Sequence, residues 1–370
     1  MNSVWIAADS IVSPLGSTSR ENYEKLRAGN SALRNTDDMR LSPTPFIAGK
    51  IPGLNTIPGM TILESITCQA IEEAIQSLEL PLARTIFILS STKGNISFLE
   101  EGNSKHPRLH LHALAEFIAS KFGFKSHLVV SNACISGVMA LIVGKRMIES
   151  GKADHVVVAG ADVLSRFVVS GFQSLQALSD EPCRPFDAER KGINLGEGAA
   201  AIVLTGKPGE LGSDPAVKIL GGGLSNDANH ISGPSRSGEE LGYAIRQALV
   251  EADVKQNEID FISAHGTATL YNDEMEAKAF NIHQLAAVPT HSLKGYFGHT
   301  LGAAGVLEVA MCVASLLQNE LLPSKGFQRL GVSQPLSVIE RLERRELRTC
   351  LKTASGFGGC NAAIILRKEN

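Results

Sequence analysis

One cysteine stands where an apolar strand is expected to turn into a helix. The strand covers His127–Ser131 and the next residues read Asn-Ala-Cys-Ile-Ser-Gly, so Cys134 is expected in the first turn of a helix from about Ala133 to Ser150. Unpaired N–H groups and the helix dipole at that end favour a thiolate and can lower the pKa of a cysteine. They can also form an oxyanion hole for a thioester carbonyl. Cys134 is therefore a candidate nucleophile, although a lone cysteine in an apolar helix is usually a small buried hydrophobe.

Two histidines stand in loops that contain glycine and threonine. His265 lies in Ser-Ala-His-Gly-Thr directly after an expected strand, and His299 lies in Phe-Gly-His-Thr just before an expected helix. The active sites of α/β folds assemble at such strand ends. Lys294, five residues before His299, offers a positive charge that can orient or polarise this histidine region. An isolated histidine in either place is more often a structural hydrogen-bonding residue, so the two must be judged with their neighbours.

The neighbours of His265 favour substrate binding over a metal site. Thr267 and Thr269 are expected to project on alternate sides of the chain, where they could bond an extended, amide-bearing molecule. A metal is the competing interpretation of two histidines, but it needs a third ligand at a sensible spacing. The sequence contains no HExxH motif and no carboxylate–histidine cluster. We therefore expect no metal.

The whole chain has the composition of a globular α/β protein. Its 370 residues are 44% hydrophobic and 20% charged, include 35 glycines, and carry a net charge of −3. No basic stripe indicates nucleic-acid binding, and no run approaches the ~20 apolar residues of a membrane span. The N-terminus does not resemble a signal peptide. Six scattered cysteines without a CxxC pair indicate a reduced, cytoplasmic protein rather than a disulfide framework.

Short apolar runs alternate with helical patterns along the chain. Strands are expected at residues 3–8, 85–90, 127–131, 154–159, 199–205, 217–221, 261–264, 289–292 and 362–367, and helices at 19–28, 60–77, 111–122, 133–150, 239–252, 273–281 and 302–318. Turn formers concentrate in residues 205–214, and the pattern begins afresh after them. This predicts two α/β halves, residues 1–205 and 206–370, with helices on both faces of the sheets. A similar element order in both suggests a structural duplication, although no sequence repeat is visible.

Several motifs in one order resemble the β-ketoacyl-acyl-carrier-protein synthases of the thiolase superfamily, in their elongating type. The resemblance covers nearly the whole chain, through Val4–Gly16, Leu26–Ser31, Ala133–Gly137, Arg184–Ala199, Asn226–Pro234, the two histidine motifs and Gly356–Asn361. It implies thiolase-like duplicated α/β halves that form a layered α-β-α-β-α sandwich.

The resemblance also implies a reaction for the Cys-His-His set. Cys134 would accept an acyl chain as a thioester, and His265 and His299 would bind the carbonyl of a malonyl thioester and promote decarboxylation. The carbanion equivalent would then attack the Cys134 thioester and give a β-ketoacyl product two carbons longer. A thioester still reacts with carbon nucleophiles, and neutral histidines can donate hydrogen bonds to a developing enolate. Because loss of carbon dioxide generates the nucleophile, no metal or organic cofactor is expected beyond the phosphopantetheine of the carrier protein.

Further roles follow from the same resemblance. Thr267 and Thr269 would hold the phosphopantetheine arm, and Lys294 would support the His299 side. Glu308 matches the buried acidic residue of the family. Phe357 matches the aromatic gate beside the nucleophile, and its N–H should join that of Cys134 in the oxyanion hole.

The sequence departs from the family pattern at three places, of which the first two concern gating and chain length. The region from Ser90 to Cys134, which shapes the acyl tunnel and the dimer surface, is abbreviated. Ser355 replaces an aromatic residue, and Cys360, interpreted as a packing residue, replaces a threonine. Short synthases of this kind resemble those of aryl-polyene, flexirubin or polyketide clusters as much as those of fatty-acid synthesis.

Two other functions compete with elongation. A chain-length-factor-like partner subunit resembles a synthase but typically lacks the nucleophile, so Cys134 with both histidines argues against it. A thiolase-type coenzyme A acyltransferase uses a second cysteine as base, and an initiating synthase has asparagine where His299 stands. The expected partners are an acyl carrier protein and a second subunit, either a copy of this chain or a synthase-like subunit.

Overall fold

The computed structural model describes residues 3–53, 56–212, 216–228 and 230–369 of the chain. Residues 213 and 214 of the expected turn segment, and residue 229 of the Asn226–Pro234 motif, lie outside the described residues.

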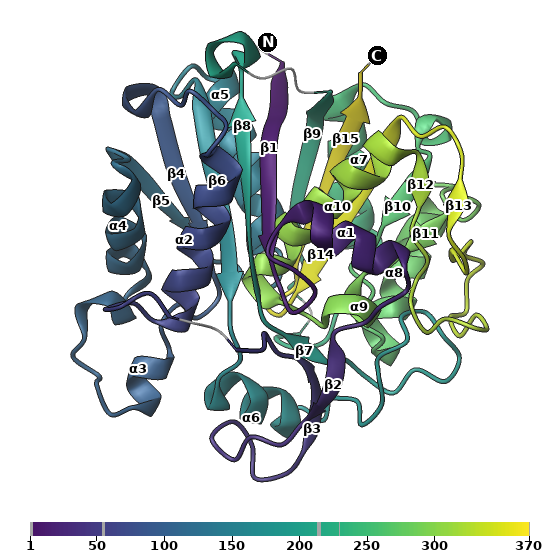
Figure 1. The fold of residues 1–370 in the computed structure, drawn as a ribbon. Helices are drawn as coiled ribbons and strands as arrows, with labels where there is room; N and C mark the ends of the chain where they lie inside the picture. The colour runs from purple at the N-terminus through teal and green to yellow at the C-terminus, as the bar shows by residue number, and fades with distance from the viewer. Residues whose placement is uncertain (1–2, 54–55, 213–215, 229, 370) are drawn as a thin grey trace.

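Ten strands form one continuous sheet, which consists of two sets of five (Figure 1). The first set contains β1 (Val4–Val12), β4 (Thr85–Ser90), β5 (Ser126–Val130), β6 (His155–Asp162) and β8 (Gly198–Thr205). The second contains β9 (Val217–Asn226), β10 (Phe261–Ser263), β11 (Thr290–His291), β14 (Thr349–Gly356) and β15 (Cys360–Lys368). The sets meet where the first residues of β1 pair antiparallel with β9. The boundary expected at residue 205 is the last residue of β8.

Both sets have the same topology. The spatial order of the strands is β1-β8-β6-β4-β5 in the first set and β9-β15-β14-β10-β11 in the second. When the strands of each set are numbered along the chain, this order is 1-5-4-2-3 in both. In both, the first, fifth and fourth strands are antiparallel neighbours, whereas the fourth, second and third are parallel neighbours. Equivalent loops of the two sets therefore occupy equivalent places at the ends of the strands.

The helices form three layers around the two sets of strands. The middle layer is α5 (Ser136–Glu149) and α10 (Ala304–Gln318), which share one apolar core with β6 and β8 of the first set and β9 and β15 of the second. On the outer faces, α2 (Ile62–Ile75) and α4 (Leu111–Phe122) cover the first set. The second set is covered by α7 (Glu239–Ala252) and α8 (Leu270–Ile282). The predicted α-β-α-β-α fold is confirmed.

Several elements near the site were not expected from the sequence. They are α6 (Arg166–Ser174), α9 (Lys294–Phe297), β14, and a small sheet of β2 (Leu33–Thr36), β3 (Phe46–Gly49) and β7 (Leu195–Gly196), which lies with α6 at the lower end of the view in Figure 1. The remaining elements are α1 (Ser19–Arg27), α3 (Ser97–Glu100), β12 (Glu320–Leu321) and β13 (Glu343–Arg344). β14 escapes sequence analysis because it is buried on both faces and contains a lysine, so it shows no alternation of polar and apolar residues.

The two middle helices touch through glycines. A Cβ placed on Gly137 of α5 would lie 2.7 Å from the backbone nitrogen of Val306, and one on Gly305 of α10 would lie 2.4 Å from that of Val138. Backbone atoms cannot rotate away as a side chain can. The close approach positions the residues before α5 and α10, which include Cys134 and His299.

We expect Gly305→Ala to lower the free energy of unfolding by about 3 kcal/mol through overpacking. Gly171→Ala in α6 is the matched control, because among the described residues beyond its chain neighbours and its own helix backbone no heavy atom lies within 4 Å of the added Cβ. Helix propensity predicts unchanged or higher stability for that control. Urea unfolding of both variants measures the difference, and equal effects would contradict the role assigned to the helix contact.

Among the described residues, one stretch has the length and apolar composition of a membrane span, whereas the sequence analysis expected none. Residues 301–318, which include α10, meet both criteria, but 83% of this stretch is buried inside the fold. It therefore serves as the core helix between the two sets of strands.

Candidate active site

Cys134 lies on a tight connection between β5 and α5. Ala133 has φ 44°, in the left-handed region that residues with a side chain seldom adopt. The hydroxyl of Ser136 accepts from the N–H of Asn132 at 2.7 Å and donates to the carbonyl of Ala133 at 2.6 Å. The helix begins at Ser136, so Cys134 precedes its first turn, which corrects the expected position.

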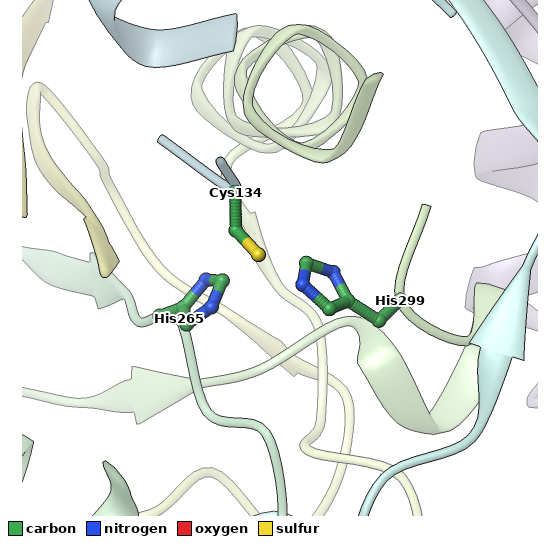
Figure 2. Close-up of side chains that lie close together, drawn as sticks. All are labelled: Cys134, His265 and His299. Atoms are coloured by element: carbon green, nitrogen blue, oxygen red, sulfur yellow. The ribbon is translucent and has the colours of Figure 1, made fainter. Parts of the chain in front are cut away.

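His265 and His299 face Cys134 from the second set of strands (Figure 2). His265 follows the end of β10, and His299 lies between α9 and α10. Cys134 Sγ and one nitrogen of each ring all lie within 4.8 Å of one another, and the ring centroids are 5.1 Å apart. Cys134 and His299 each lie between a third strand and a middle helix, so the duplication brings them to matching ends of α5 and α10.

A cavity of about 460 Å³ reaches the three side chains from the surface. Its walls include Leu175, Arg190, Thr267, Thr269 and Phe357. On another side, Cys134 packs in an apolar cluster with Phe46, Leu164, Val168 and Leu301, from β3, α6 and the connections around them. The nucleophile is therefore reached through a cavity lined by both polar and apolar residues, and it packs against apolar side chains on its other side.

Lys294 contacts His265, whereas the sequence analysis placed it on the His299 side. Its Nζ donates to Nδ1 of His265 at 3.3 Å, to the carbonyl of His265 at 2.6 Å and to Glu308 Oε1 at 2.8 Å. An ammonium group only donates, so Nδ1 of His265 is the acceptor and its Nε2 carries the proton. Among the described residues neither ring nitrogen of His299 has a hydrogen-bond partner. Both rings therefore have nitrogen atoms available to a substrate.

Burial sets the protonation of all three groups. It lowers the pKa of His265 and of His299 well below the usual 6.5, and the charges of Lys294 and Lys352 lower both further. Both rings are neutral at pH 7. Burial, followed by the neighbouring Cys360, raises the pKa of Cys134 to about 12, so the lowered pKa expected from a helix end is wrong. The resting group is a thiol, and its proton must leave as the acyl group arrives.

Thr267 and Thr269 lie on the same side of the chain, and their hydroxyl groups are 2.8 Å apart. The sequence analysis placed them on alternate sides of the chain, which is wrong. Ala268 has φ 60°, and this turn brings the two side chains together. Both threonines line the cavity.

Phe357 lines the cavity beside Cys134 and is 40% exposed. Its ring stacks on Phe172 of α6, with centroids 5.5 Å apart. The preceding Gly356 approaches the nucleophile so closely that a Cβ there would lie 2.9 Å from the nitrogen of Cys134 and from Cys360 Sγ. Cys360 is buried in this contact, and Ser355 donates to Asn361 at 2.8 Å.

Lys352 is a charged residue of the site that sequence reasoning missed. It is fully buried in β14, and its Nζ lies 2.7 Å from Glu308 Oε2. The sequence feature that could have identified Lys352 is a lysine within the largely apolar run Thr349–Ala354, shortly before the Gly356–Asn361 motif. Cys134, His265 and His299 are also of a ligand type that zinc accepts. The two buried lysines beside them disfavour a cation there.

A duplicated thiolase-like fold that joins a buried cysteine to two neutral histidines defines the class of condensing enzymes. The comparisons name the family within it. Residues 100–208 match the N-terminal domain of β-ketoacyl synthases and residues 216–328 match the C-terminal domain. The chain belongs to the β-ketoacyl synthase family, whose members are condensing acyltransferases.

Individual relatives agree with this assignment. The chain is 29% identical to 3-oxoacyl-acyl-carrier-protein synthase 2 of Rhizobium meliloti, over 100% of this chain and 99% of that protein. It is 33% identical to nodulation protein E of Rhizobium leguminosarum bv. trifolii over 65% of this chain, and the match spans 61% of that protein's length. The solved complex of the ketosynthase ApeO with its chain length factor ApeC from Xenorhabdus doucetiae matches with a TM-score of 0.87 and 27% identity. That match covers 99% of this chain and 98% of the matched chain.

Proposed function

We propose that this protein condenses an acyl thioester on Cys134 with malonyl-acyl carrier protein and releases a β-ketoacyl-acyl carrier protein. The observation that carries the proposal is the meeting of Cys134 Sγ with one nitrogen of each histidine within 4.8 Å. The product would serve fatty-acid, aryl-polyene or polyketide-type biosynthesis.

The first step transfers the acyl group. The sulfur of Cys134 attacks the acyl thioester as its proton passes to a neighbouring imidazole, and the carrier thiol leaves with a proton. The N–H groups of Cys134 and Phe357 are proposed to bind the oxyanion, since Gly356 lies against the Cys134 nitrogen. The apolar cluster around Cys134 supports an apolar acyl chain.

The second step forms the carbon–carbon bond. A malonyl carrier thioester accepts hydrogen bonds from His265 Nε2 and from His299, and its carboxylate leaves as carbon dioxide. The carbanion equivalent attacks the Cys134 thioester, and the displaced sulfur recovers a proton. Neutral imidazoles suit this step because a hydrogen-bond donor is needed where negative charge develops.

Partners and compartment follow as further parts of the proposal. Thr267 and Thr269, which both reach the cavity, would hold the phosphopantetheine arm. A second subunit is proposed, either a copy of this chain or a synthase-like subunit, as in the ApeO–ApeC complex. We infer that no cofactor beyond phosphopantetheine is needed. The six buried free cysteines support a reducing cytoplasm.

The direct test is to incubate the protein with acyl- and malonyl-charged carrier protein and follow the carrier by mass. A carrier bearing a β-ketoacyl chain two carbons longer than the primer, with release of carbon dioxide, is the expected result. Absence of product with several chain lengths, alone and with a synthase-like subunit from the same source, would overturn the proposal.

A chain-length-factor-like role is the alternative. Structures that contain such factors resemble this fold, but Cys134, His265 and His299 are present and converge. Formation of product only with a second, catalytic subunit, and no loss when Cys134 is replaced, would favour this role.

A further inference from the structure

A chain of three buried charges lies behind the two histidines. Glu308 of α10 stands between two lysines, with Oε1 2.8 Å from Lys294 Nζ and Oε2 2.7 Å from Lys352 Nζ. Both lysines are fully buried. A single lysine would suffice to neutralise Glu308, so the second one calls for a physical reason.

The two lysines hold three successive backbone carbonyls. Lys352 donates to the carbonyls of Ser263 and Ala264, each at 3.2 Å, and Lys294 donates to that of His265 at 2.6 Å. These carbonyls lie where β10 ends, just before Gly266 turns the chain with φ +45°. Lys352 therefore fixes the backbone that carries His265.

Lys352 also joins this strand end to the rest of the site. Its own strand, β14, ends at Gly356, which lies against the nitrogen of Cys134. Glu308 lies on the helix that follows His299. Lys352 therefore links three segments through buried polar contacts. They are β14, which leads to Gly356 beside Cys134, the end of β10, which carries His265, and α10, which follows His299.

The charge of Lys352 acts on the histidines as well. The groups that face Lys352 are Glu308 of α10, Glu276 of α8, His265, His299, and the buried thiols Cys312 and Cys350. Glu276 accepts from the N–H of His265 at 2.8 Å and from that of Gly266 at 2.6 Å. Burial raises the pKa of Glu276, because its charged form is poorly solvated there.

We propose that Lys352 is a second positioning lysine of the condensation, which fixes the strand end that carries His265 and supplies positive charge that opposes protonation of His265 and His299. This inference rests on the proposed function. Lys352 touches no reacting atom and acts through its neighbours.

Lys352→Met removes the positive charge of the side chain, whereas Lys352→Arg keeps the charge and changes its geometry. For Lys352→Met we expect a fall in kcat of about 10- to 100-fold, because a small displacement of a catalytic group is costly. The acidic limb of the pH profile should move upward by on the order of one pH unit. Lys352→Arg should keep the limb in place while kcat falls, because its planar group cannot reproduce the same contacts. The readouts are malonyl decarboxylation against pH and NMR titration of the His265 and His299 rings.

Lys145→Met is the matched control. Lys145 is also buried and pairs with Glu149 and Glu251, each at 2.7 Å, on α5 away from the histidines. The Lys145→Met variant should be less stable than the wild-type protein, but the acidic limb of its pH profile should not shift. A folded Lys352→Met with an unmoved limb, or a Lys352→Arg limb that moves, would overturn the proposal. If Lys352→Met does not fold, the pH profile of Lys352→Arg is the test, and a shift of its acidic limb would overturn the proposal.

The ring titration separates this proposal from the proposed function. If the wild-type protein shows no condensation, the NMR titration of both rings in wild type and variants still measures the effect of Lys352. Rings that titrate at or above pH 6.5 in the wild-type protein would overturn the role of Lys352 without reference to activity.

Discussion

Cys134→Ala is expected to abolish the acyl adduct and to lower condensation at least about 1000-fold, because it removes the thiol assigned to carry the acyl chain. Incubation with acyl-charged carrier protein, followed by intact-protein mass spectrometry, shows the adduct. Peptide mapping then places it on residue 134. Cys134→Ala should still decarboxylate malonyl carrier thioesters, since the histidines remain.

Cys360→Ala is the sharpest control for this experiment. Cys360 is a second buried cysteine near the nucleophile, with its Sγ 3.4 Å from the carbonyl of Phe357. A synthase should keep its adduct and most of its activity without Cys360. Loss of all activity in Cys360→Ala would instead indicate a second catalytic cysteine, as in a thiolase. An adduct that persists in Cys134→Ala would contradict the assignment of the nucleophile.

His299→Ala is expected to reduce malonyl decarboxylation by about 100- to 1000-fold, the usual loss when one donor to a developing oxyanion is removed. Both nitrogens of His299 are buried and, within the described residues, unpaired, so the ring is free to bind substrate. In this variant, formation of the acyl adduct on Cys134 should be reduced less, relative to the wild-type protein, than formation of the condensation product. Release of carbon dioxide from malonyl carrier protein measures the step in isolation.

The pH dependence of the same reaction has a defined sign. Because the pKa values of both histidines lie well below 6.5, decarboxylation should be nearly constant from pH 8 to 6.5 and decline only at lower pH, as the rings become charged. His155→Ala, which removes a buried histidine at the start of β6, should leave this profile unchanged. Full decarboxylation by His299→Ala, or a midpoint at or above pH 6.5, would refute the assigned role.

Much of the fold was visible in the sequence. The strand at Thr85–Ser90 and the helices at Leu111–Phe122 and Glu239–Ala252 agree with the structure at both ends. These segments have strong periodicity or an unbroken apolar run, which local sequence encodes directly. The small sheet and α6 were not predicted because they are short and are stabilised by contacts with distant segments. β14 was missed because a buried lysine interrupts its apolar run.

The sequence by itself determined the identities of Cys134, His265 and His299, because each stands in a motif that resembles one of the β-ketoacyl synthases. Only the tertiary structure decided how they act. The helix after Cys134 begins too late to hold the thiol in its first turn, and burial raises its pKa instead of lowering it. Lys294 bonds His265, and a turn at Ala268 brings Thr267 and Thr269 together. Lys352 joins the site from a strand 58 residues after Lys294. The protonation states and side-chain contacts of these residues depend on which distant segments pack together, and the fold as a whole sets that packing.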